Sequence, residues 1–319
     1  MTSPIALVLP GQGAQYPGMA VELHGAEPVF TAAMDSFFES MGTVGTELRA
    51  DWLSEQPRVP LDDASRAQPL LFALGYALGR TLMERGITPS VLIGHSVGEL
   101  AAAALAGVFD PSGAAQVILA RYEAMATAPR GGLLAVSAAA SDVERYLDHS
   151  GGTGIAAINA PNLTVVSGPE AELVQVREVL SANGIGSMRV GSRQPFHCPA
   201  VVAAGEKFEA GFAGVTLRPP RIPIISTRTG HPVTPSQAVT PEFWARQLDA
   251  PVLYWPALDT LFGAGDYTVV EAGPGKGLSM LAKKHPAVRG RRSSVVSLSP
   301  TRASGTLTAW RDGLAQLSH

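Results

Sequence analysis

Short apolar runs that end in glycine-rich turns alternate with segments of helical spacing in the first 130 residues. The run IALVLPGQG (5–13) predicts a buried strand and a tight turn, and SVLIGHS (90–96) predicts a second strand that stops at Gly94. Helices are predicted over 67–86, 97–107 and 110–128, the last opened by the capping residues DPSG. Strand, tight turn and helix in this order indicate an α/β sheet core.

Between about 130 and 195 the predicted elements become shorter and change order. Strands are predicted at LLAVSA, GIAAINA, LTVVSG and SMRVG, with helices at SDVERYLDHSGG and PEAELVQVREVLSANG. This βαββαβ order is that of a ferredoxin-like unit. The larger pattern then resumes with the strands RIPIIST, DYTVVEAGPG and SVVSLS and the helices PEFWARQL, KGLSMLAKK and TLTAWRDGLAQL. We therefore predict an α/β fold: a large, α/β-hydrolase-like parallel-sheet domain (1–128 and 196–319) with an inserted ferredoxin-like subdomain (129–195).

Composition narrows the class of protein. The 319 residues are 46% hydrophobic and 16% charged, and no stretch of 18 apolar residues predicts a membrane span. The start lacks the basic region of a secretory signal, and the single cysteine, Cys198, excludes an internal disulfide and a cysteine-based zinc site. We therefore expect a cytoplasmic protein without a metal. A net charge of −3 gives no general attraction to nucleic acid.

The segment LIGHSVGEL (92–100) carries the Gly-x-Ser-x-Gly pattern around Ser96. A serine on a sharp strand-to-helix turn is exposed at the positive end of a helix and can act as a nucleophile. Glycines suit positions 94 and 98, because a β-carbon would clash where the chain turns so tightly. A helix-capping serine that fits the pattern by chance is the alternative.

A serine nucleophile needs a base, and seven histidines are available. His197, in SRQPFHCPA, follows the last strand of the insert and precedes a helix, so an element end can project it into a cleft. His95, next to Ser96 on the tight turn, is expected to point away from the serine; it is a substrate-binding candidate. The other histidines lie in settings typical of loops or chain ends.

Four ordered motifs together resemble the malonyl-CoA:acyl-carrier-protein transacylase family, which includes the acyltransferase domains of polyketide synthases and free-standing relatives. They are LPGQGAQ (9–15), GHSVGE (94–99), PFHCP (195–199) and EAGPGKGL (271–278). The resemblance covers nearly the whole chain. It implies that Ser96 is acylated and that His197 is its base, oriented by backbone carbonyls and nearby amides rather than by a carboxylate. It also implies an oxyanion hole formed by the backbone amides of Gln12 and Val97.

The resemblance also implies where the acyl group binds. Arg121 falls on the family arginine that binds the free carboxylate of malonyl or methylmalonyl groups, which suits a bidentate guanidinium. Phe196 stands where malonyl-selecting members have phenylalanine. Gln247 and Asn159 match family residues near the site, although a surface glutamine and a turn asparagine explain them almost as well. Two departures could reshape the pocket: Pro195, preceded by Gln194, where alanine is usual, and Tyr122, where a small residue is common.

We therefore expect an enzyme that moves malonyl from coenzyme A to the phosphopantetheine thiol of an acyl carrier protein, in fatty-acid or polyketide biosynthesis. No bound cofactor is needed, since acyl-CoA and the phosphopantetheinyl carrier are substrates, and a monomer is typical of the family. The basic run KKHPAVRGRR is a candidate docking surface for an acidic carrier. Its cations are Lys283, Lys284, Arg289, Arg291 and Arg292.

Three alternatives stay open. A free-standing relative could move a larger acyl or aminoacyl group between carrier proteins. A serine hydrolase or thioesterase of the α/β-hydrolase type shares the nucleophile turn, but it predicts an acid after the serine and a histidine near the C-terminus. A carrier-binding scaffold without activity is disfavoured because Ser96, His197, Arg121 and Gln12 are all present.

Overall fold

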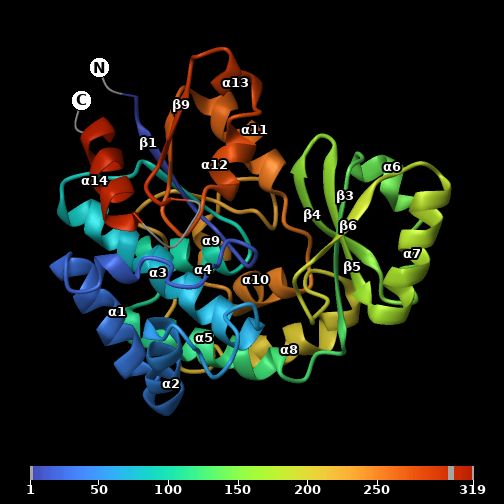
Figure 1. Ribbon diagram of the computed structural model, residues 1–319, viewed down its shortest axis with the longest axis horizontal. Coiled ribbons are helices and arrows are strands. Elements are labelled where there is room, and N and C mark those ends of the chain that lie inside the picture. Colours follow the sequence, from blue (N-terminus) through green and yellow to red (C-terminus); the bar gives the residue numbers. More distant parts are fainter. Residues whose placement is uncertain (1–2, 301–304, 318–319) are drawn as a thin grey trace.

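Two separate sheets organise the computed structural model, which describes residues 3–300 and 305–317 (Figure 1). The larger sheet has five parallel strands in the order β7-β2-β1-β8-β9. These strands are β1 (Ile5–Leu9), β2 (Val91–Gly94), β7 (Ile224–Ile225), β8 (Thr268–Glu271) and β9 (Ser294–Ser297). Leu9 is paired with Gly94, so β1 and β2 end side by side. The turns that follow both strands therefore meet at one edge of the sheet.

Helices cover both faces of the parallel sheet, which explains why the central residues of its strands are apolar on both faces. Leu7 and Leu9 point to one face, where they join a core with the N-terminal helices and the last helix. Ala6 and Val8 point to the other face, against a second group of helices. The first group is α1 (Pro28–Ser40), α2 (Gly42–Leu53), α3 (Ala64–Glu84), α4 (Val97–Leu105), α5 (Pro111–Met125) and α14 (Thr306–Leu317). The second group is α11 (Tyr254–Ala264), α12 (Gly277–Ala282) and α13 (Pro286–Arg289).

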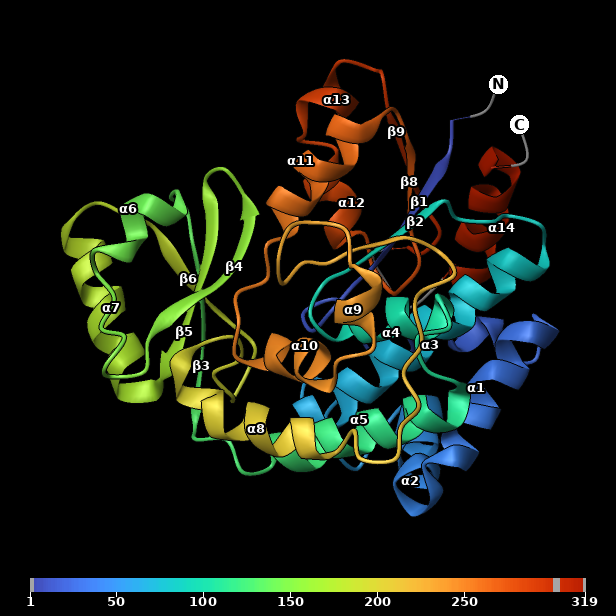
Figure 2. The ribbon, with the colours of Figure 1, turned by 180° about the vertical axis from the view of Figure 1, so that it is seen from behind.

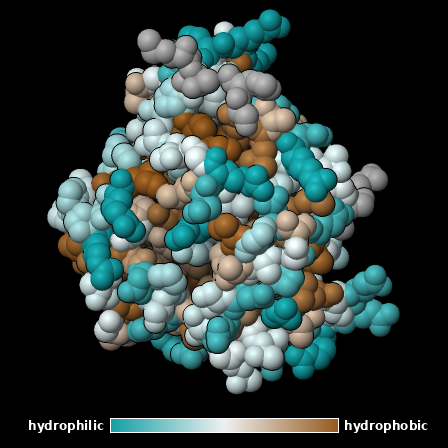
Figure 3. All heavy atoms as spheres, turned by 90° about the vertical axis from the view of Figure 1, so that its left-hand side faces the viewer, coloured by the Kyte–Doolittle hydropathy of each residue, from teal (hydrophilic) through white to brown (hydrophobic). Residues whose placement is uncertain are grey.

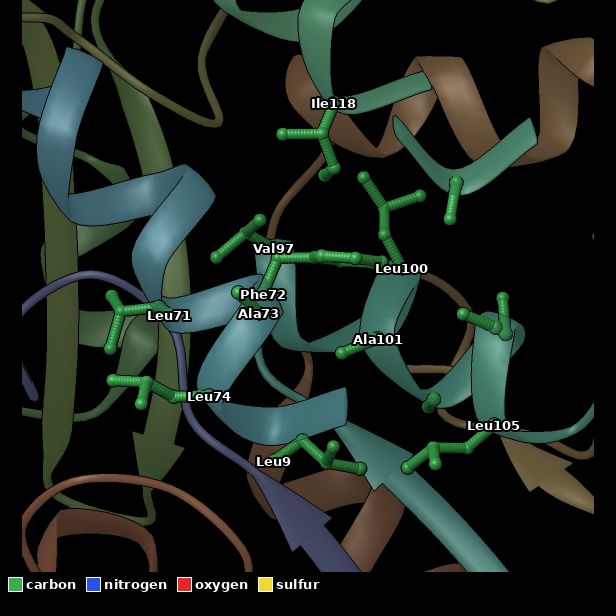
Figure 4. Close-up of a cluster of buried hydrophobic side chains, with 14 of the residues drawn as sticks. Leu9, Leu71, Phe72, Ala73, Leu74, Val97, Leu100, Ala101, Leu105 and Ile118 are labelled. Carbon is green, nitrogen blue, oxygen red and sulfur yellow. The ribbon is translucent and has the colours of Figure 1, made fainter. Parts of the chain in front are cut away.

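Helix α4 is buried on all sides, and Figure 4 shows its environment. Val97, Leu100 and Ala101 of α4 lie against apolar side chains of α3, β1 and α5, among them Leu71, Leu74, Leu9 and Ile118. Small residues let the helices approach closely: a β-carbon at Gly79 of α3 would lie 2.4 Å from Leu105 Cδ1. The alanine-rich sequence after Ser96 therefore forms a rigid core helix rather than a surface helix.

The smaller sheet is antiparallel, with the order β4-β5-β3-β6. Its strands are β3 (Gly131–Val136), β4 (Gly154–Ala160), β5 (Leu163–Pro169) and β6 (Ser187–Val190), and its helices are α6 (Ala140–Glu144) and α7 (Glu170–Ala182). Leu134 and Val136 pack under these helices with Val166, Leu173 and Leu180 in a core of their own. The predicted fold class, including the ferredoxin-like βαββαβ unit, is confirmed. The exact domain boundaries stay a prediction.

The segment after residue 245 connects the two sheets. Val252 forms a parallel bridge with Ala157 of β4, and Ile158 N–H donates to Val252 O at 2.9 Å. On the way to this segment, α8 (Val202–Ala210) packs beside α5 and α10 (Pro241–Ala245) packs against α8 (Figure 2). The remaining elements are short. Three-residue 3₁₀ helices lie at Val21–Leu23, Pro199–Val201 and Arg246–Leu248, and the short α-helix α9 spans Pro235–Ala238.

One predicted element is much shorter than its sequence pattern. RIPIIST forms only the two-residue strand β7, because Pro219, Pro220 and Pro223 lack the amide donors that a longer ladder needs. Five helices lie in ranges for which the sequence pattern predicted none: α1, α2, α9, α11 and α13. The helix expected after His197 is α8.

The surface carries both polar and apolar residues. On the face in Figure 3, which is the left-hand side of Figure 1, apolar residues lie interspersed with charged ones. Scattered apolar residues are normal on a protein surface. No helix in residues 3–300 or 305–317 combines the length and the apolarity that crossing a membrane requires.

Candidate active site

Ser96 stands on a strained turn between β2 and α4. Its φ of 55° and ψ of −122° lie in a region that glycine favours, so the surrounding structure has to hold the serine there. Gly94 and Gly98 make the turn possible: a β-carbon at either position would lie 2.2 Å from backbone atoms, of Glu99 and Leu9 respectively. The Gly-x-Ser-x-Gly spacing therefore has the steric cause that the sequence predicts.

His197 is in hydrogen-bond contact with Ser96: its Nε2 lies 2.7 Å from Ser96 Oγ. Its Nδ1 lies 2.9 Å from the backbone oxygen of Gln247 and 3.0 Å from that of Ala250. Because carbonyl oxygens only accept, Nδ1 carries the proton, and Nε2 is left to accept from the serine hydroxyl. The arrangement is that of a nucleophile and its general base.

Burial keeps this histidine neutral. The pKa of His197 is lowered to about 3, first by burial and then by the nearby Arg121 and His95, while the two carbonyl hydrogen bonds act in the opposite direction. At neutral pH the imidazole is therefore unprotonated and able to take the serine proton.

Gln12 and Val97 lie beside the serine, where a negative oxygen would form. Val97 is the first residue of α4, and Gln12 follows Gly11, at which a β-carbon would lie 2.4 Å from His95 O and 3.1 Å from Ser96 Cβ. In the described part of the chain, neither backbone amide donates to a protein acceptor. Both are free for an oxyanion.

A cavity of about 200 Å³ opens in front of Ser96, between the two sheets. His95 and Asn159 face it, and His95 Nε2 lies 3.0 Å from Asn159 Oδ1, so His95 borders the same cavity as the serine instead of pointing away. Phe196 is buried and lines the cavity. The small sheet supplies an apolar wall that consists of Leu133, Ala135, Ala156, Ala157, Leu163, Val165 and Val190.

Arg121 is buried and incompletely paired. Its Nε donates to Gln68 Oε1 at 2.8 Å, whereas Nη1 and Nη2 have no hydrogen-bond partner among the described residues. Burial lowers the pKa of the guanidinium, which stays charged at neutral pH. Arg121 lines a second cavity, of about 190 Å³, rather than the cavity of Ser96, and Gln68 lines both. The structure thus places Gln68 between Arg121 and Gln12, in the wall of the Ser96 cavity.

Gln247 contributes its backbone to the site. Its carbonyl oxygen accepts a hydrogen bond from His197 Nδ1, while both polar atoms of its buried side chain lack a partner in the described structure.

The side chain of Glu99, in the first turn of α4, makes no hydrogen bond to Ser96 among the described residues. Its buried carboxylate accepts from the Ser226 hydroxyl and from the amide and hydroxyl of Thr227, so it joins α4 to the end of β7.

The basic run at 283–292 lies away from this site. It precedes β9, and Ser294 pairs with Thr268 at the amino end of β8, whereas Ser96 follows the carboxyl end of β2. Parallel strands place these ends at opposite edges of the sheet, and α13 stands far from α4 in Figure 1. The structure therefore does not bring the run to the mouth of the Ser96 cavity. Its five cations are all exposed.

Sequence reasoning missed Gln68. Its amide joins two site residues, since Nε2 donates to Gln12 Oε1 at 3.0 Å and Oε1 accepts from Arg121. It lies in AQPLLF, where the helical pattern alone identifies it as one more position of α3. A buried glutamine inside an otherwise apolar helix face is the signal that could have marked it.

The whole fold has solved counterparts among acyltransferases. The acyltransferase domain from the second module of the salinomycin polyketide synthase has a TM-score of 0.90 and 30% identity, over 99% of this chain and 73% of that one. A malonyl-CoA:acyl carrier protein transacylase from Xanthomonas oryzae has a TM-score of 0.84 and 29% identity, over 97% of this chain and 99% of that one. The fold and the serine–histidine pair define an acyltransferase class.

The chain belongs to the acyl transferase domain family, whose pattern it matches over residues 6–296. The resemblance stated from the motifs is confirmed, and the protein is an acyltransferase. A phenolphthiocerol/phthiocerol polyketide synthase component of Mycobacterium tuberculosis is 34% identical over 283 residues, which is 88% of this chain and 19% of that protein. The chain thus spans about a fifth of the length of such curated relatives.

Proposed function

We propose that this protein transfers a malonyl group from coenzyme A to the phosphopantetheine thiol of an acyl carrier protein, through an acyl-serine on Ser96. The observation that carries the proposal is the 2.7 Å contact between Ser96 Oγ and His197 Nε2. The cavity in front of this pair is also lined by Gln68, the hydrogen-bond partner of the incompletely paired Arg121. The named relatives are polyketide synthases, and the solved counterparts include a transacylase for malonyl-CoA.

The first half-reaction forms the acyl-enzyme. His197 takes the proton of Ser96 as the oxygen attacks the thioester carbonyl, and the amides of Gln12 and Val97 stabilise the oxyanion. The carbon–sulfur bond then breaks, and His197 gives the proton to the departing thiol of coenzyme A. In the second half-reaction the carrier thiol attacks the acyl-serine, and the same proton transfers run in reverse. One thioester replaces another, so no oxidant or reductant is needed.

Arg121 supports a carboxylated acyl group. Two buried guanidinium nitrogens without partners match the two oxygens of a carboxylate, and burial strengthens such a pair. An acetyl group would leave the arginine unpaired, at a cost of about 1 to 3 kcal/mol. Phe196 beside His197 favours malonyl over methylmalonyl, because its ring takes up space next to the reacting carbon.

The apolar wall of the cavity supports a carrier arm as the acyl donor or acceptor. A phosphopantetheine arm is largely uncharged along its length, and the small sheet offers it an apolar surface up to Ser96. Enclosure between two sheets also limits the water that could hydrolyse the acyl-serine.

Intact-protein mass spectrometry tests the proposal. After mixing with malonyl-CoA, the wild-type protein is expected to gain one malonyl group, and Ser96→Ala none. Arg121→Ala is expected to lower the malonyl loading rate about 100-fold and to change the acetyl loading rate much less, because only malonyl has a carboxylate to pair.

A panel of acyl donors separates the alternatives. Preferred loading of a larger acyl or aminoacyl group from a carrier protein, with no malonyl adduct on the wild type, would reject malonyl as the substrate. Release of free malonate without transfer to any carrier thiol would instead indicate a hydrolase. Equal loss of malonyl and acetyl loading in Arg121→Ala would remove the arginine from the carboxylate site.

A further inference from the structure

Gln68 lies in the walls of two cavities, one in front of Ser96 and one beside Arg121. The Ser96 cavity measures about 200 Å³ and the Arg121 cavity about 190 Å³. Among the described residues that line them, Gln68 alone belongs to both walls. Its side chain is held at each end, since Nε2 donates to Gln12 Oε1 at 3.0 Å and Oε1 accepts from Arg121 Nε at 2.8 Å. These two hydrogen bonds hold the Gln68 side-chain amide in place where the Ser96 cavity and the Arg121 cavity adjoin.

The Arg121 cavity has the chemistry of a site for the end of an acyl group. Apolar side chains of Pro69, Ile118 and Met125 form much of its wall, and the guanidinium lies at its boundary with Gln68. Tyr122 and Gln194 complete it. Tyr122 is one of the two departures of the sequence from the pattern of malonyl-selecting relatives, and Gln194 directly precedes the other, Pro195.

We infer that Gln68 is a specificity-determining residue that sets the length of the carboxylated acyl group on Ser96. The inference rests on the proposed function. With Gln68 in place, a carboxylate meets Arg121 at the boundary between the cavities, which suits a three-carbon malonyl group. Without the Gln68 side chain the two cavities join, and unbranched dicarboxylic acyl groups longer than malonyl extend past the boundary. Acyl groups of this class are succinyl and glutaryl.

Two substitutions of Gln68 give opposite signatures. Gln68→Ala is expected to join the two cavities. The ratio of the glutaryl loading rate to the malonyl loading rate should then rise by at least about tenfold, because one or two methylene groups in an apolar pocket change rates by about this factor. Gln68→Glu places a carboxylate on Arg121 in competition with the substrate. Malonyl loading is then expected to fall about 100-fold, while acetyl loading stays within about threefold of wild type.

The experiment uses the full chain and measures initial rates of adduct formation on Ser96 with malonyl-CoA, succinyl-CoA, glutaryl-CoA and acetyl-CoA. Gln116→Ala is the matched control. This glutamine lies on α5, donates to the backbone oxygens of Gly211 and Ala213, and lines neither cavity, so its rate ratios are expected to equal those of wild type.

The outcomes separate the two proposals. If wild type forms no malonyl adduct, the proposed function fails. If wild type loads malonyl but Gln68→Ala keeps the wild-type ratio, or Gln68→Glu lowers malonyl and acetyl loading equally, Gln68 has only a structural role and the inference is overturned. Wild type that loads glutaryl as fast as malonyl also overturns it. Should Gln68→Ala not fold, the selective loss in Gln68→Glu decides the question.

Discussion

The serine–histidine pair depends on backbone groups more than on charged neighbours. Two carbonyl oxygens, of Gln247 and Ala250, fix the ring of His197, and its backbone amide donates to Leu248 O at 2.9 Å. A carbonyl pair holds the tautomer as a carboxylate would, but it stabilises the imidazolium less. Burial, which lowers the pKa of His197, therefore outweighs the two carbonyl hydrogen bonds, which raise it, and the base remains neutral.

The pH dependence of loading should reflect this burial. The ordinary pKa of a histidine is 6.5, whereas that of His197 is about 3, so the neutral base persists far below pH 6.5 and is lost only as the pH falls toward its lowered pKa. We expect the single-turnover loading rate to stay constant from about pH 8 to about pH 5. The rate is followed by the release of coenzyme A.

Arg121→Ala provides the control for the pH profile. The positive charge of Arg121 helps to lower the pKa of His197, so its removal should move the acidic limb toward neutral pH. A half-loss of the wild-type rate near pH 6.5 would contradict this account.

Most single site residues could be predicted only through motifs. Ser96 and its glycines follow from the physics of a tight turn, and the structure gives the steric reason at Gly94 and Gly98. His197 lies 101 residues away in sequence, so no local pattern joins it to the serine. The link that Gln68 forms between Gln12 and Arg121 could not be predicted, because it depends on how α3 packs against the turn after β1.

At the scale of elements, helix α4 is held at its start by a buried carboxylate. Glu99 accepts three hydrogen bonds from Ser226 and Thr227, at 2.5 to 3.0 Å. Burial raises the pKa of this carboxyl, and the hydrogen bonds oppose that change. The hydroxyl of Thr227 also donates to Gly94 O. The nucleophile turn is thus fixed from the neighbouring strand β7.

Glu99→Ala should destabilise the fold strongly. The substitution leaves the Ser226 hydroxyl and the Thr227 amide buried without their acceptor, while the Thr227 hydroxyl keeps Gly94 O, and we expect the free energy of unfolding to fall by about 3 kcal/mol. Urea unfolding monitored by circular dichroism measures it. Glu99→Gln, which keeps the shape and one acceptor oxygen, should lose about half as much. A loss below about 1 kcal/mol in Glu99→Ala would show that this linkage is dispensable.

Element prediction succeeded where periodicity was strong and failed where prolines interrupt a short apolar run. The helices α3, α4 and α5 and the βαββαβ order follow from apolar spacing. The length of the strand at RIPIIST was overestimated, because its β-branched residues indicate a strand while Pro223 and the prolines before the run cannot donate to the ladder. The positions of the two sheets relative to each other have no local sequence pattern at all.

On the scale of the whole molecule, one short segment joins the base to both sheets. Gln247 and Ala250 hold His197, and Val252 follows at once with its bridge to β4, where Val252 N–H donates to Ala156 O at 2.8 Å. A displacement of the small sheet would therefore move the backbone at 247–252 and change the position of the His197 ring.

Val252→Pro tests this connection. Proline lacks the amide that donates to Ala156, so we expect the small sheet to loosen and the share of acyl-serine lost to water to rise about tenfold. Hydrogen exchange at Ile158 and the ratio of hydrolysis to transfer report the two effects. Val252→Ala keeps the amide and is the control. Equal hydrolysis ratios in both variants would contradict the connection.

Ser96 and His197 both have a backbone conformation of positive φ, which lowers the stability of the fold but places the two side chains of the proposed site. Ser96 and His197 have φ values of 55° and 63°, and neither is glycine. Glycine at position 96 would relieve the backbone strain but remove the hydroxyl, so the variant should be more stable and inactive. Ser96→Gly is expected to raise the free energy of unfolding by about 1 kcal/mol, measured by thermal unfolding. Ser96→Ala keeps the β-carbon and should gain nothing. The most stable form of this turn would thus lack the proposed nucleophile.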